Sequence, residues 1–444
     1  MWRCPVHVQL IFRIDEPDTR MALRTKNTAT SFPALCSDAL VREIVEQILS
    51  ATPDVPLLLN RLQTELHQPA AAASRILYDV VRQVNSSLFP PVTKLELMLS
   101  EGCNLACSYC FEKSALRKRR MSGHIARAAI DLLFDYARDH SSLKITHFGG
   151  EPTLNFEVLS EATRYAEQKA AAVGKTVSFH MTSNGVGFTR EMISFLADHH
   201  IMVLLSIDGL ARTHDRFRVD RRGRGTFDLV METVRNLKVR QPWIGAKMTV
   251  MPGAVDDLYD NVVGLYNLGV NQFVIGHATG VKWSVAEIEY LHAQLCRIRQ
   301  WYEGRKHQHD LRIAEFENEP VKDHGNYFGC QAAQTGISTA ANGEISACSK
   351  VITLKPDEVI GKLGDVDHGL THIHSRLEMT GCQTLRANCE AEGIADDFRG
   401  GCFACNYEEH KDLFKPNLQE YVFSNLFKAV REGKPFRQGA SKGC

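Results

Sequence analysis

The sequence lacks the features that mark several large classes of protein. It carries no net charge, because 52 lysines and arginines balance 52 aspartates and glutamates. This balance argues against a nucleic acid or a membrane surface as partner. No run of about 18 apolar residues occurs, so no membrane span is expected. The first residues lack a signal peptide's long apolar region and cleavage site, and neither internal repeats nor low-complexity tracts stand out.

Cysteine, in contrast, is abundant, with thirteen residues in a chain of 444. In a chain without an export signal, this number predicts a cytoplasmic protein whose cysteines serve as ligands rather than disulfides. The length suggests about two to three domains. An apolar content of 44% is enough for a sizeable core.

Three cysteines stand close together at Cys103, Cys107 and Cys110, with the spacing C-x3-C-x2-C. Clustered thiolates on a short loop favour an iron–sulfur cluster or zinc. A four-iron cluster takes four ligands, so three cysteines leave one iron open. Structural zinc sites use four ligands, often as paired C-x2-C arms, and this triplet fits that pattern poorly.

At these residues the chain resembles the radical S-adenosylmethionine (SAM) enzymes. In that family the C-x3-C-x2-C loop binds a 4Fe–4S cluster, and the open iron takes the amino and carboxylate groups of SAM. Tyr109, just before Cys110, also matches the family. The resemblance implies an oxidoreductase that cleaves SAM reductively and uses the 5′-deoxyadenosyl radical to abstract a hydrogen from its substrate. It also implies an electron donor such as flavodoxin or ferredoxin.

Strand and helix patterns alternate on both sides of the cysteine loop. A strand over residues 93–99 leads into the loop, and a helix over 124–138 follows. Such alternation predicts an α/β fold with a parallel sheet. About six units fit between residues 93 and 280, which resembles the partial (β/α)6 TIM-type barrel of the family. The functional loops then lie at the C-terminal ends of the strands. Further strands are expected at 143–148, 177–182, 200–207, 246–251 and 272–275.

The loops after these strands resemble the SAM-binding motifs of the family. Gly149-Gly150-Glu151-Pro152 matches its GGEP motif, so backbone groups and Glu151 are expected to bind the SAM amino group. The alternative is an ordinary Gly-Gly-x-Pro turn. Polar residues that the resemblance places against the SAM ribose and carboxylate follow the next two strands: Ser183, Asn184, Ser206 and Asp208. For Asp208, capping of a loop is the alternative.

The run from Thr213 to Arg218 resembles the family's H-D-x-x-R segment. There an arginine pairs with the SAM carboxylate, and such pairing is strong and directional. We prefer Arg218 to Arg216 for this role. The alternative is a solvated basic loop, because several arginines cluster here. No residue is assigned to acid–base catalysis.

The C-terminal third carries seven more cysteines, and Gly343 precedes Cys348 by five positions. This part resembles the SPASM extension of radical SAM enzymes that modify peptides, including a β-hairpin over residues 337–349. The resemblance implies two auxiliary 4Fe–4S clusters. Their expected ligands are Cys330, Cys348 and Cys405 for the first cluster, and Cys382, Cys389 and Cys402 for the second.

The later half of the extension departs from the family pattern. The usual short cysteine run is replaced by Cys382-x6-Cys389-x12-Cys402-x2-Cys405, and the helix expected over 418–430 has no cysteine. Cys444 then completes the second site, or one iron stays open. Zinc is the alternative for Cys402 and Cys405.

These patterns predict four regions. Residues 1–91 form a small helical module, similar to winged-helix elements that bind leader peptides; a helical adaptor packed on the catalytic domain is the alternative. The radical SAM core spans 92–285, a connecting helix and linker span 286–325, and the SPASM domain spans 326–444.

The leading hypothesis is an enzyme that abstracts a hydrogen from a ribosomally made precursor peptide and installs a thioether, carbon–carbon or related link. A second enzyme hypothesis is an anaerobic sulfatase-maturing enzyme that makes formylglycine. That group typically has an aspartate directly after the cysteine matching Cys348, where this chain has Ser349 and Lys350. A metal-binding scaffold without turnover is the non-enzyme alternative, and the SAM-binding loops argue against it.

Overall fold

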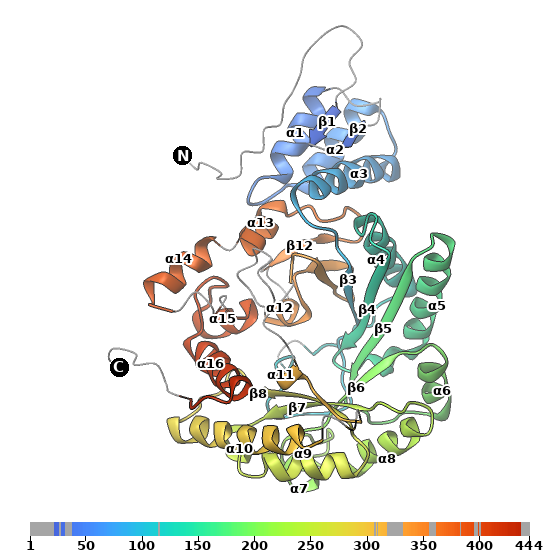
Figure 1. The fold of residues 1–444 in the computed structure, drawn as a ribbon. Coiled ribbons are helices and arrows are strands. Elements are labelled where there is room, and N and C mark those ends of the chain that lie inside the picture. Colours follow the sequence, from blue (N-terminus) through green and yellow to red (C-terminus); the bar gives the residue numbers. More distant parts are fainter. Residues whose placement is uncertain are drawn as a thin grey trace.

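The computed structural model describes residues 22–25, 28–31, 38–113, 116–305, 308, 310–317, 332–354, 361–381, 383–394, 398 and 401–436. An N-terminal helical module sits above a curved sheet, and a C-terminal extension lies beside the sheet (Figure 1). Three of the expected cluster ligands, Cys330, Cys382 and Cys444, lie outside the described residues.

The N-terminal module has its own apolar core. An antiparallel pair of strands, β1 (Ala22–Thr25) and β2 (Thr28–Ser31), precedes helices α1 (Asp38–Ile48), α2 (Val55–Leu66) and α3 (Ala70–Leu88). The three helices fall where apolar spacing predicts helices. Their inner faces form one cluster, which Ile373 from the C-terminal extension joins.

Six parallel strands form the centre of the structure, as the sequence predicts. Each is hydrogen-bonded to the next one along the chain. They are β3 (Lys94–Ser100), β4 (Ser142–Gly149), β5 (Thr176–Ser183), β6 (Met202–Ser206), β7 (Gly245–Val250) and β8 (Gln272–His277).

The sheet extends beyond these six strands at both edges. The short β9 (Arg312–Ile313) pairs in parallel with β8. At the other edge, β10 (Gly336–Thr339) of the C-terminal extension pairs in parallel with β3. The extension is therefore continuous with the barrel sheet rather than a separate appendage.

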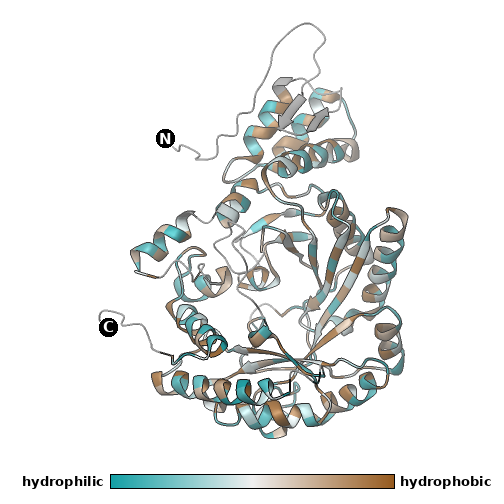
Figure 2. Ribbon diagram, viewed as in Figure 1, coloured by the Kyte–Doolittle hydropathy of each residue, from teal (hydrophilic) through white to brown (hydrophobic). Residues whose placement is uncertain are grey.

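Helices cover the outer face of the sheet (Figure 1). Each helix carries both polar and apolar residues (Figure 2), and the apolar residues pack onto the strands in one large core. These helices are α4 (Gly123–Tyr136), α5 (Phe156–Ala172), α6 (Arg190–Asp198), α7 (Ala211–Phe217), α8 (Phe227–Lys238), α9 (Leu258–Asn267) and α10 (Val285–Glu303). Short helices η1 (Pro152–Asn155), η2 (Pro252–Ala254) and α11 (Ala314–Glu317) follow β4, β7 and β9.

The hairpin expected over residues 337–349 is present in a shorter form. Strand β10 pairs antiparallel with β11 (Glu344–Ser346), and Gly343 turns between them at φ +91°. Strand β12 (Lys362–Asp365) pairs with β11. Five helices complete the described part of the extension: α12 (Ser349–Leu354), α13 (Ile373–Gly381), α14 (Gln383–Ala391), α15 (Phe403–His410) and α16 (Leu418–Glu432).

A buried arginine joins the extension to the N-terminal module. The guanidinium of Arg376, on α13, donates to the Asn85 side-chain oxygen of α3 over 2.8 Å. It also donates to the backbone oxygens of Ala333 and Gln334, at 2.8 and 2.9 Å. Asn85 in turn donates to the backbone oxygen of Leu370, at 2.9 Å. Among the described residues, no helix has the length and apolarity needed to cross a bilayer.

Candidate active site

The cysteine loop begins directly after β3, at the C-terminal end of the sheet. Backbone hydrogen bonds hold it against the segment that follows α7: Ala106 donates to Val219, at 2.8 Å, and Ser108 donates to Phe217, at 3.0 Å. Cys103, Cys107 and Cys110 are all partly buried. The loop therefore has a fixed path between two elements that are distant in sequence.

Several donors are directed at the three sulfurs. The backbone N–H of Leu105 lies 3.4 Å from the Cys103 sulfur, and the Asn184 amide lies 3.6 Å from it. Arg218 donates to Cys107, and the backbone N–H of Glu112 donates to Cys110. Donors of this kind stabilise thiolates and not neutral thiols.

The donor set fits an iron–sulfur cluster. Burial, together with the charges of Glu151, Cys107 and Cys110, raises the pKa of Cys103 to about 12. Burial raises the pKa values of Cys107 and Cys110 as well. Such thiols stay protonated unless a cation offsets their charge. Within the described chain, no three such ligands converge on one metal ion. In a cluster each thiolate binds a different iron, so convergence on one point is not required.

The two glycines of the GGEP motif pack against the cysteine loop. A side chain at Gly149, which has φ +130°, would place its Cβ 2.3 Å from the Ser100 backbone oxygen. A Cβ on Gly150 would lie 2.5 Å from the Gly102 oxygen. The N–H groups of Gly150 and Glu151 donate to these same two oxygens, at 2.8 and 2.9 Å. Only glycine permits this approach, and the backbone donors are used within the protein.

Glu151 joins the ends of β4 and β5. Its carboxylate is fully buried and caps η1, whose first residue is Pro152, by accepting from the N–H and hydroxyl of Thr153 at 3.1 and 2.7 Å. It also accepts from the Ser183 hydroxyl at 2.9 Å and from the Asn184 N–H at 2.8 Å. The Asn184 side-chain amide donates to the side-chain oxygen of Asn104 in the cysteine loop, at 2.7 Å. The predicted residues of the second and third strand ends are thus brought together with the cysteine loop.

Asp208 and Arg218 form a buried pair beside Cys107. Arg218 donates two parallel hydrogen bonds to the Asp208 carboxylate, at 2.9 and 3.1 Å. The Thr249 N–H donates to Asp208 at 2.9 Å, and the Tyr109 hydroxyl donates to it as well. Burial lowers the pKa of Arg218, but Asp208 outweighs burial and the net pKa is raised. Arg218 is therefore a permanent cation inside the site and not part of a solvated basic loop.

Ser206 ends β6 and lies opposite Lys247 of β7 in the sheet register. It is partly buried, and it lies two residues before Asp208. The SAM contacts predicted for the strand-end residues stay predictions, although the structure gathers these residues around the cysteine loop.

In the extension, Cys402 and Cys405 lie together at the start of α15. A hydrogen bond between the two thiols, together with nearby Lys350, lowers the pKa of Cys402. The Lys350 ammonium donates to the Cys405 sulfur at 3.3 Å and to Glu408 at 2.8 Å. It also donates to Thr279 at 2.8 Å, just past β8. The resemblance assigned the two cysteines to different clusters, whereas here they are in contact.

The remaining described cysteines of the extension are more dispersed. Cys348 immediately precedes α12 and is partly buried. Cys389 is buried on α14. With Cys330, Cys382 and Cys444 outside the described residues, neither set of auxiliary ligands can be assembled completely.

Sequence reasoning missed several residues at these sites. Lys350, Asn104 and Glu112 carry no motif, yet each contacts a candidate ligand or its loop. The available signal was proximity in sequence, because each lies within two positions of a cysteine. Their partners come from other elements, so proximity alone does not identify them.

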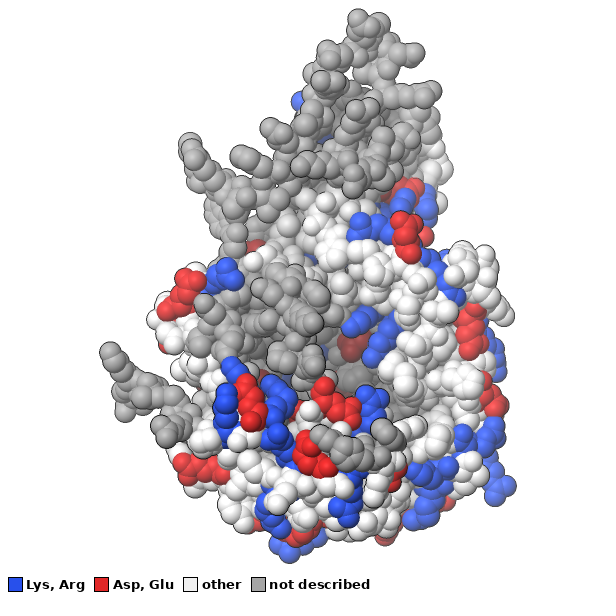
Figure 3. Space-filling model, viewed as in Figure 1, with Lys and Arg blue, Asp and Glu red and all other residues white. Residues whose placement is uncertain are grey.

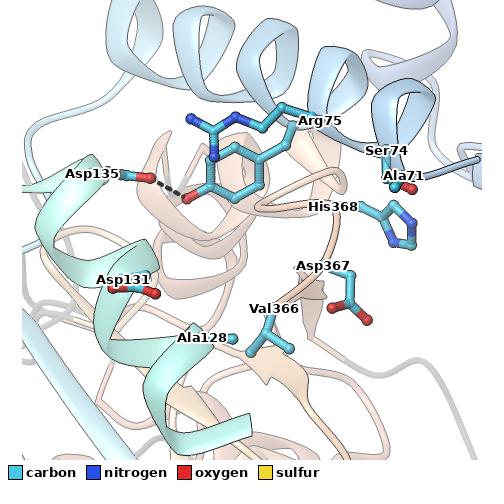
Figure 4. Close-up of a pocket in the computed structure, with 10 residues that line it drawn as sticks. Ala71, Ser74, Arg75, Ala128, Asp131, Asp135, Val366, Asp367 and His368 are labelled. Carbon is cyan, nitrogen blue, oxygen red and sulfur yellow. Dashed lines mark hydrogen bonds between the residues drawn. The ribbon is translucent and has the colours of Figure 1, made fainter. Parts of the chain in front are cut away.

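A separate pocket of about 430 Å³ lies where α3, α4 and the turn after β12 meet (Figure 4). The Tyr78 hydroxyl donates to Asp135 across it, at 3.0 Å. The lining residues are Ala71, Ser74, Arg75, Tyr78, Ala128, Asp131, Asp135, Val366, Asp367 and His368.

Comparison with known families agrees with this geometry. A model of the radical SAM superfamily matches residues 97–264. A serine-type anaerobic sulfatase-maturating enzyme of Bacteroides thetaiotaomicron is 32% identical over 145 residues, which are 31% of this chain and 34% of that protein. The sporulation killing factor maturation protein SkfB of Bacillus subtilis is 27% identical over 228 residues, 50% of this chain and 52% of that one. The chain thus matches about a third to a half of the length of these relatives.

Two solved structures share the fold. Native anSMEcpe with bound AdoMet and the Kp18Cys peptide gives a TM-score of 0.61 at 18% identity, covering 77% of this chain and 100% of that chain. Streptococcus suis SuiB bound to precursor peptide SuiA gives 0.53 at 15% identity, covering 79% and 81%. Residues 97–264 are therefore a radical SAM domain. The protein that carries it is similar, in sequence and in fold, to radical SAM maturases.

Proposed function

We propose that the protein is a radical SAM maturase that modifies a ribosomally made precursor peptide. The observation that carries this proposal is the assembly at the strand ends. Three partly buried cysteines share it with Arg218 and Asp208, which are buried and paired. Similarity to a maturation protein and to two enzymes solved with a bound peptide supports a peptide as substrate.

The residues at the strand ends would each have a distinct task. Cys103, Cys107 and Cys110 would hold a 4Fe–4S cluster. When SAM is bound to it, this group supplies a carbon radical that abstracts a hydrogen atom. Arg218 places a fixed positive charge beside the Cys107 sulfur. SAM would lie against the groups expected from the sequence: Gly149, Gly150, Glu151, Pro152, Ser183, Asn184, Ser206, Asp208 and Arg218.

The other regions would serve the substrate and the electrons. We propose that residues 1–91 bind a leader peptide and that a flavodoxin or ferredoxin supplies electrons. Auxiliary 4Fe–4S clusters in the region 326–444 would accept an electron after hydrogen abstraction or bind the substrate. Their ligands would be Cys330, Cys348 and Cys405 for the first, and Cys382, Cys389 and Cys402 for the second, with Cys444 completing the second set.

Formation of 5′-deoxyadenosine tests the radical step. The anaerobically reconstituted chain, given SAM and dithionite, is expected to release 5′-deoxyadenosine. Replacing Cys103, Cys107 and Cys110 together with alanine should abolish release, because the cluster loses its ligands. Cys296→Ala on α10 is the matched control and should retain activity. Release from the triple variant at the wild-type rate would refute the proposal.

A sulfatase-maturing activity is the second candidate, since several curated relatives bear that name. Ser349 occupies the position where the sequence of that group typically has an aspartate. A general base must lie within reach of the proton it removes. We therefore expect no formylglycine from a sulfatase-derived peptide containing cysteine or serine. An aldehyde product, seen as a hydrazine adduct by mass spectrometry, would select this second candidate instead.

A further inference from the structure

The inner face of the sheet is more polar than a packed barrel core. Leu205, Ala246 and Phe273 are register partners on β6, β7 and β8, and all three are fully buried toward the outer helices. Side chains alternate along a strand. The next residues, Ser206, Lys247 and Val274, therefore point into the lumen. By the same alternation the lumen also receives Glu96, Lys144 and His180.

Lys247 is a half-buried cation on this inner face. Its ammonium lies over Gly276 of β8, where a Cβ would be 3.4 Å from the Lys247 nitrogen. Burial lowers its pKa, and the carboxylates of Glu315 and Asp208 oppose that change. Among the described residues, the ammonium has neither a hydrogen-bond acceptor nor an ion pair. An ammonium without a protein acceptor is free to donate to a bound ligand.

Glu315 supplies the complementary group. It lies on α11, beyond the end of β9, and the backbone N–H of Ile275 donates to its carboxylate. Its Oε2 atom is buried without a hydrogen-bond partner. Lys247 and Glu315 are close enough to influence each other's pKa, yet they form no direct ion pair within the described structure. Both lie beside Ile275 and Gly276 of β8.

A half-buried donor and a buried acceptor that do not bond to each other suit a ligand with one hydrogen-bond acceptor and one hydrogen-bond donor. A ligand with only a carboxylate would leave Glu315 without a donor, and a ligand with only an ammonium group would leave Lys247 without an acceptor. An amide is neutral and offers a carbonyl oxygen and an N–H group in fixed geometry. Basic and acidic side chains border the hollow in the face shown in Figure 3.

We propose that Lys247 and Glu315 form an amide clamp in the barrel lumen, in which the ammonium donates to a substrate amide carbonyl and the carboxylate accepts from its N–H. The amide belongs to the peptide backbone or to an Asn or Gln side chain. This assignment rests on the proposed function and deepens it, because it positions the substrate beside Ser206, the register partner of Lys247. Lys247 and Glu315 are positioning residues and do not contact the cysteine loop.

Direct binding of a small amide tests the clamp without turnover. The probe is N-acetylalanine N′-methylamide, followed by saturation-transfer NMR on the anaerobic full-length protein. Lys247→Met and Glu315→Leu should each weaken binding about tenfold, and the probe's ester analogue, which lacks the N–H, should bind the wild type less well. Lys247→Arg and Glu315→Gln retain a donor and an acceptor, so they should preserve most binding.

Two comparisons make the test decisive. Lys144→Met, on the same lumen face of β4, is the matched control and should bind like the wild type. In Glu315→Leu the ester should bind as well as the amide probe, because that variant has already lost the acceptor for the probe's N–H. Equal binding of the amide by wild type, Lys247→Met and Glu315→Leu would refute the clamp.

Turnover separates the clamp from the proposed function. Lys247→Met should release 5′-deoxyadenosine at the wild-type rate when peptide is absent, and should raise the KM for peptide more than it lowers kcat. Loss of the peptide-free reaction in Lys247→Met would assign the residue to SAM instead and overturn the clamp. If the wild type itself releases no 5′-deoxyadenosine, the proposed function fails whatever the binding data show. Substrates with a backbone ester, or with Asn and Gln replaced by Asp and Glu, distinguish the two sources of the amide.

Discussion

Arg218 has two acceptors that only a guanidinium can serve together. It donates two parallel hydrogen bonds to the Asp208 carboxylate and also donates to the Cys107 sulfur. Lysine keeps the charge but cannot form the two parallel bonds. We expect Arg218→Lys to slow 5′-deoxyadenosine release about tenfold. Arg218→Met should also lower the free energy of unfolding by about 3 kcal/mol, because Asp208 is left buried without its cation.

Arg216 provides the control for this prediction. It lies on α7, two positions before Arg218, which follows that helix; it is exposed, and it donates to the Gly253 backbone oxygen at 2.7 Å. Arg216→Met should change neither the rate nor the stability by a measurable amount. If Arg218→Met matched Arg216→Met in both assays, the buried pair would have no role in the site.

His147 should make the fold sensitive to acid. It is fully buried on β4, its Nε2 lies 3.0 Å from the Thr163 hydroxyl of α5, and its Nδ1 has no partner. Burial lowers its pKa to about 3. The unfolded chain binds this proton at about pH 6.5. The group's contribution is therefore complete above about pH 6.5 and is lost as the pH falls toward 3.

Urea unfolding at two pH values measures this effect. Between pH 7.5 and 5.5, His147→Gln should lose about 1.4 kcal/mol less stability than the wild type, because glutamine does not titrate. His140→Gln, at an exposed position, should behave like the wild type. Identical losses for His147→Gln and the wild type would contradict the assigned pKa direction.

The candidate site shows which residues a sequence can identify. The cysteine triplet and the Asp208 and Arg218 positions were predicted because spacing and strand ends carry them. The hydrogen bonds of Glu151 were not predicted. Its carboxylate accepts from the hydroxyls of Thr153 and Ser183 and from the backbone N–H of Asn184, and residue spacing does not tell which way these groups point. Lys247 and Glu315 were missed because no local pattern shows that Lys247 lies opposite Ser206 in the sheet or that α11 follows the edge strand β9.

At the scale of elements, long periodic segments were predictable and short ones were not. The six central strands and their helices carry regular apolar patterns, and the structure places them where these patterns occur. Strand β9 has two residues and gives no pattern. The parallel pairing of β10 with β3 joins segments about 240 positions apart in the chain, and a local hairpin pattern contains no information about such a partner.

Helix α13 depends on a buried arginine for its contact with α3. Arg376 is 1% exposed, lies over the Phe89 ring at 4.2 Å, and donates to Asn85, Ala333 and Gln334. Arg376→Met should lower the free energy of unfolding by about 3 kcal/mol, because buried oxygens on two elements lose their donor. Urea denaturation measures this, with Arg240→Met at the surface pair with Asp198 as control, expected to change stability by less than about 1 kcal/mol. Equal effects of the two substitutions would show that Arg376 does not hold the elements together.

For the molecule as a whole, the number of clusters depends on how the extension uses its cysteines. The barrel and the extension share one core and one sheet, so an electron path between them would cross a continuous protein interior. Cys402 and Cys405 touch at the start of α15, and Lys350 links them to Thr279 beside β8. Their neighbourhood is thus one place where the extension contacts the end of a barrel strand.

Iron and sulfide content after anaerobic reconstitution tests the three-cluster assignment. We expect about 12 iron per chain, because three clusters hold four iron each, and about 8 after Cys103, Cys107 and Cys110 are replaced with alanine. If Cys405 and Cys402 serve different clusters, replacing both should leave about 4 iron. If about 8 iron remain instead, the two cysteines share one cluster, as their contact allows. Zinc in place of iron would refute cluster binding in the extension. Cys296→Ala should keep the wild-type content, since α10 carries that cysteine away from both cysteine groups.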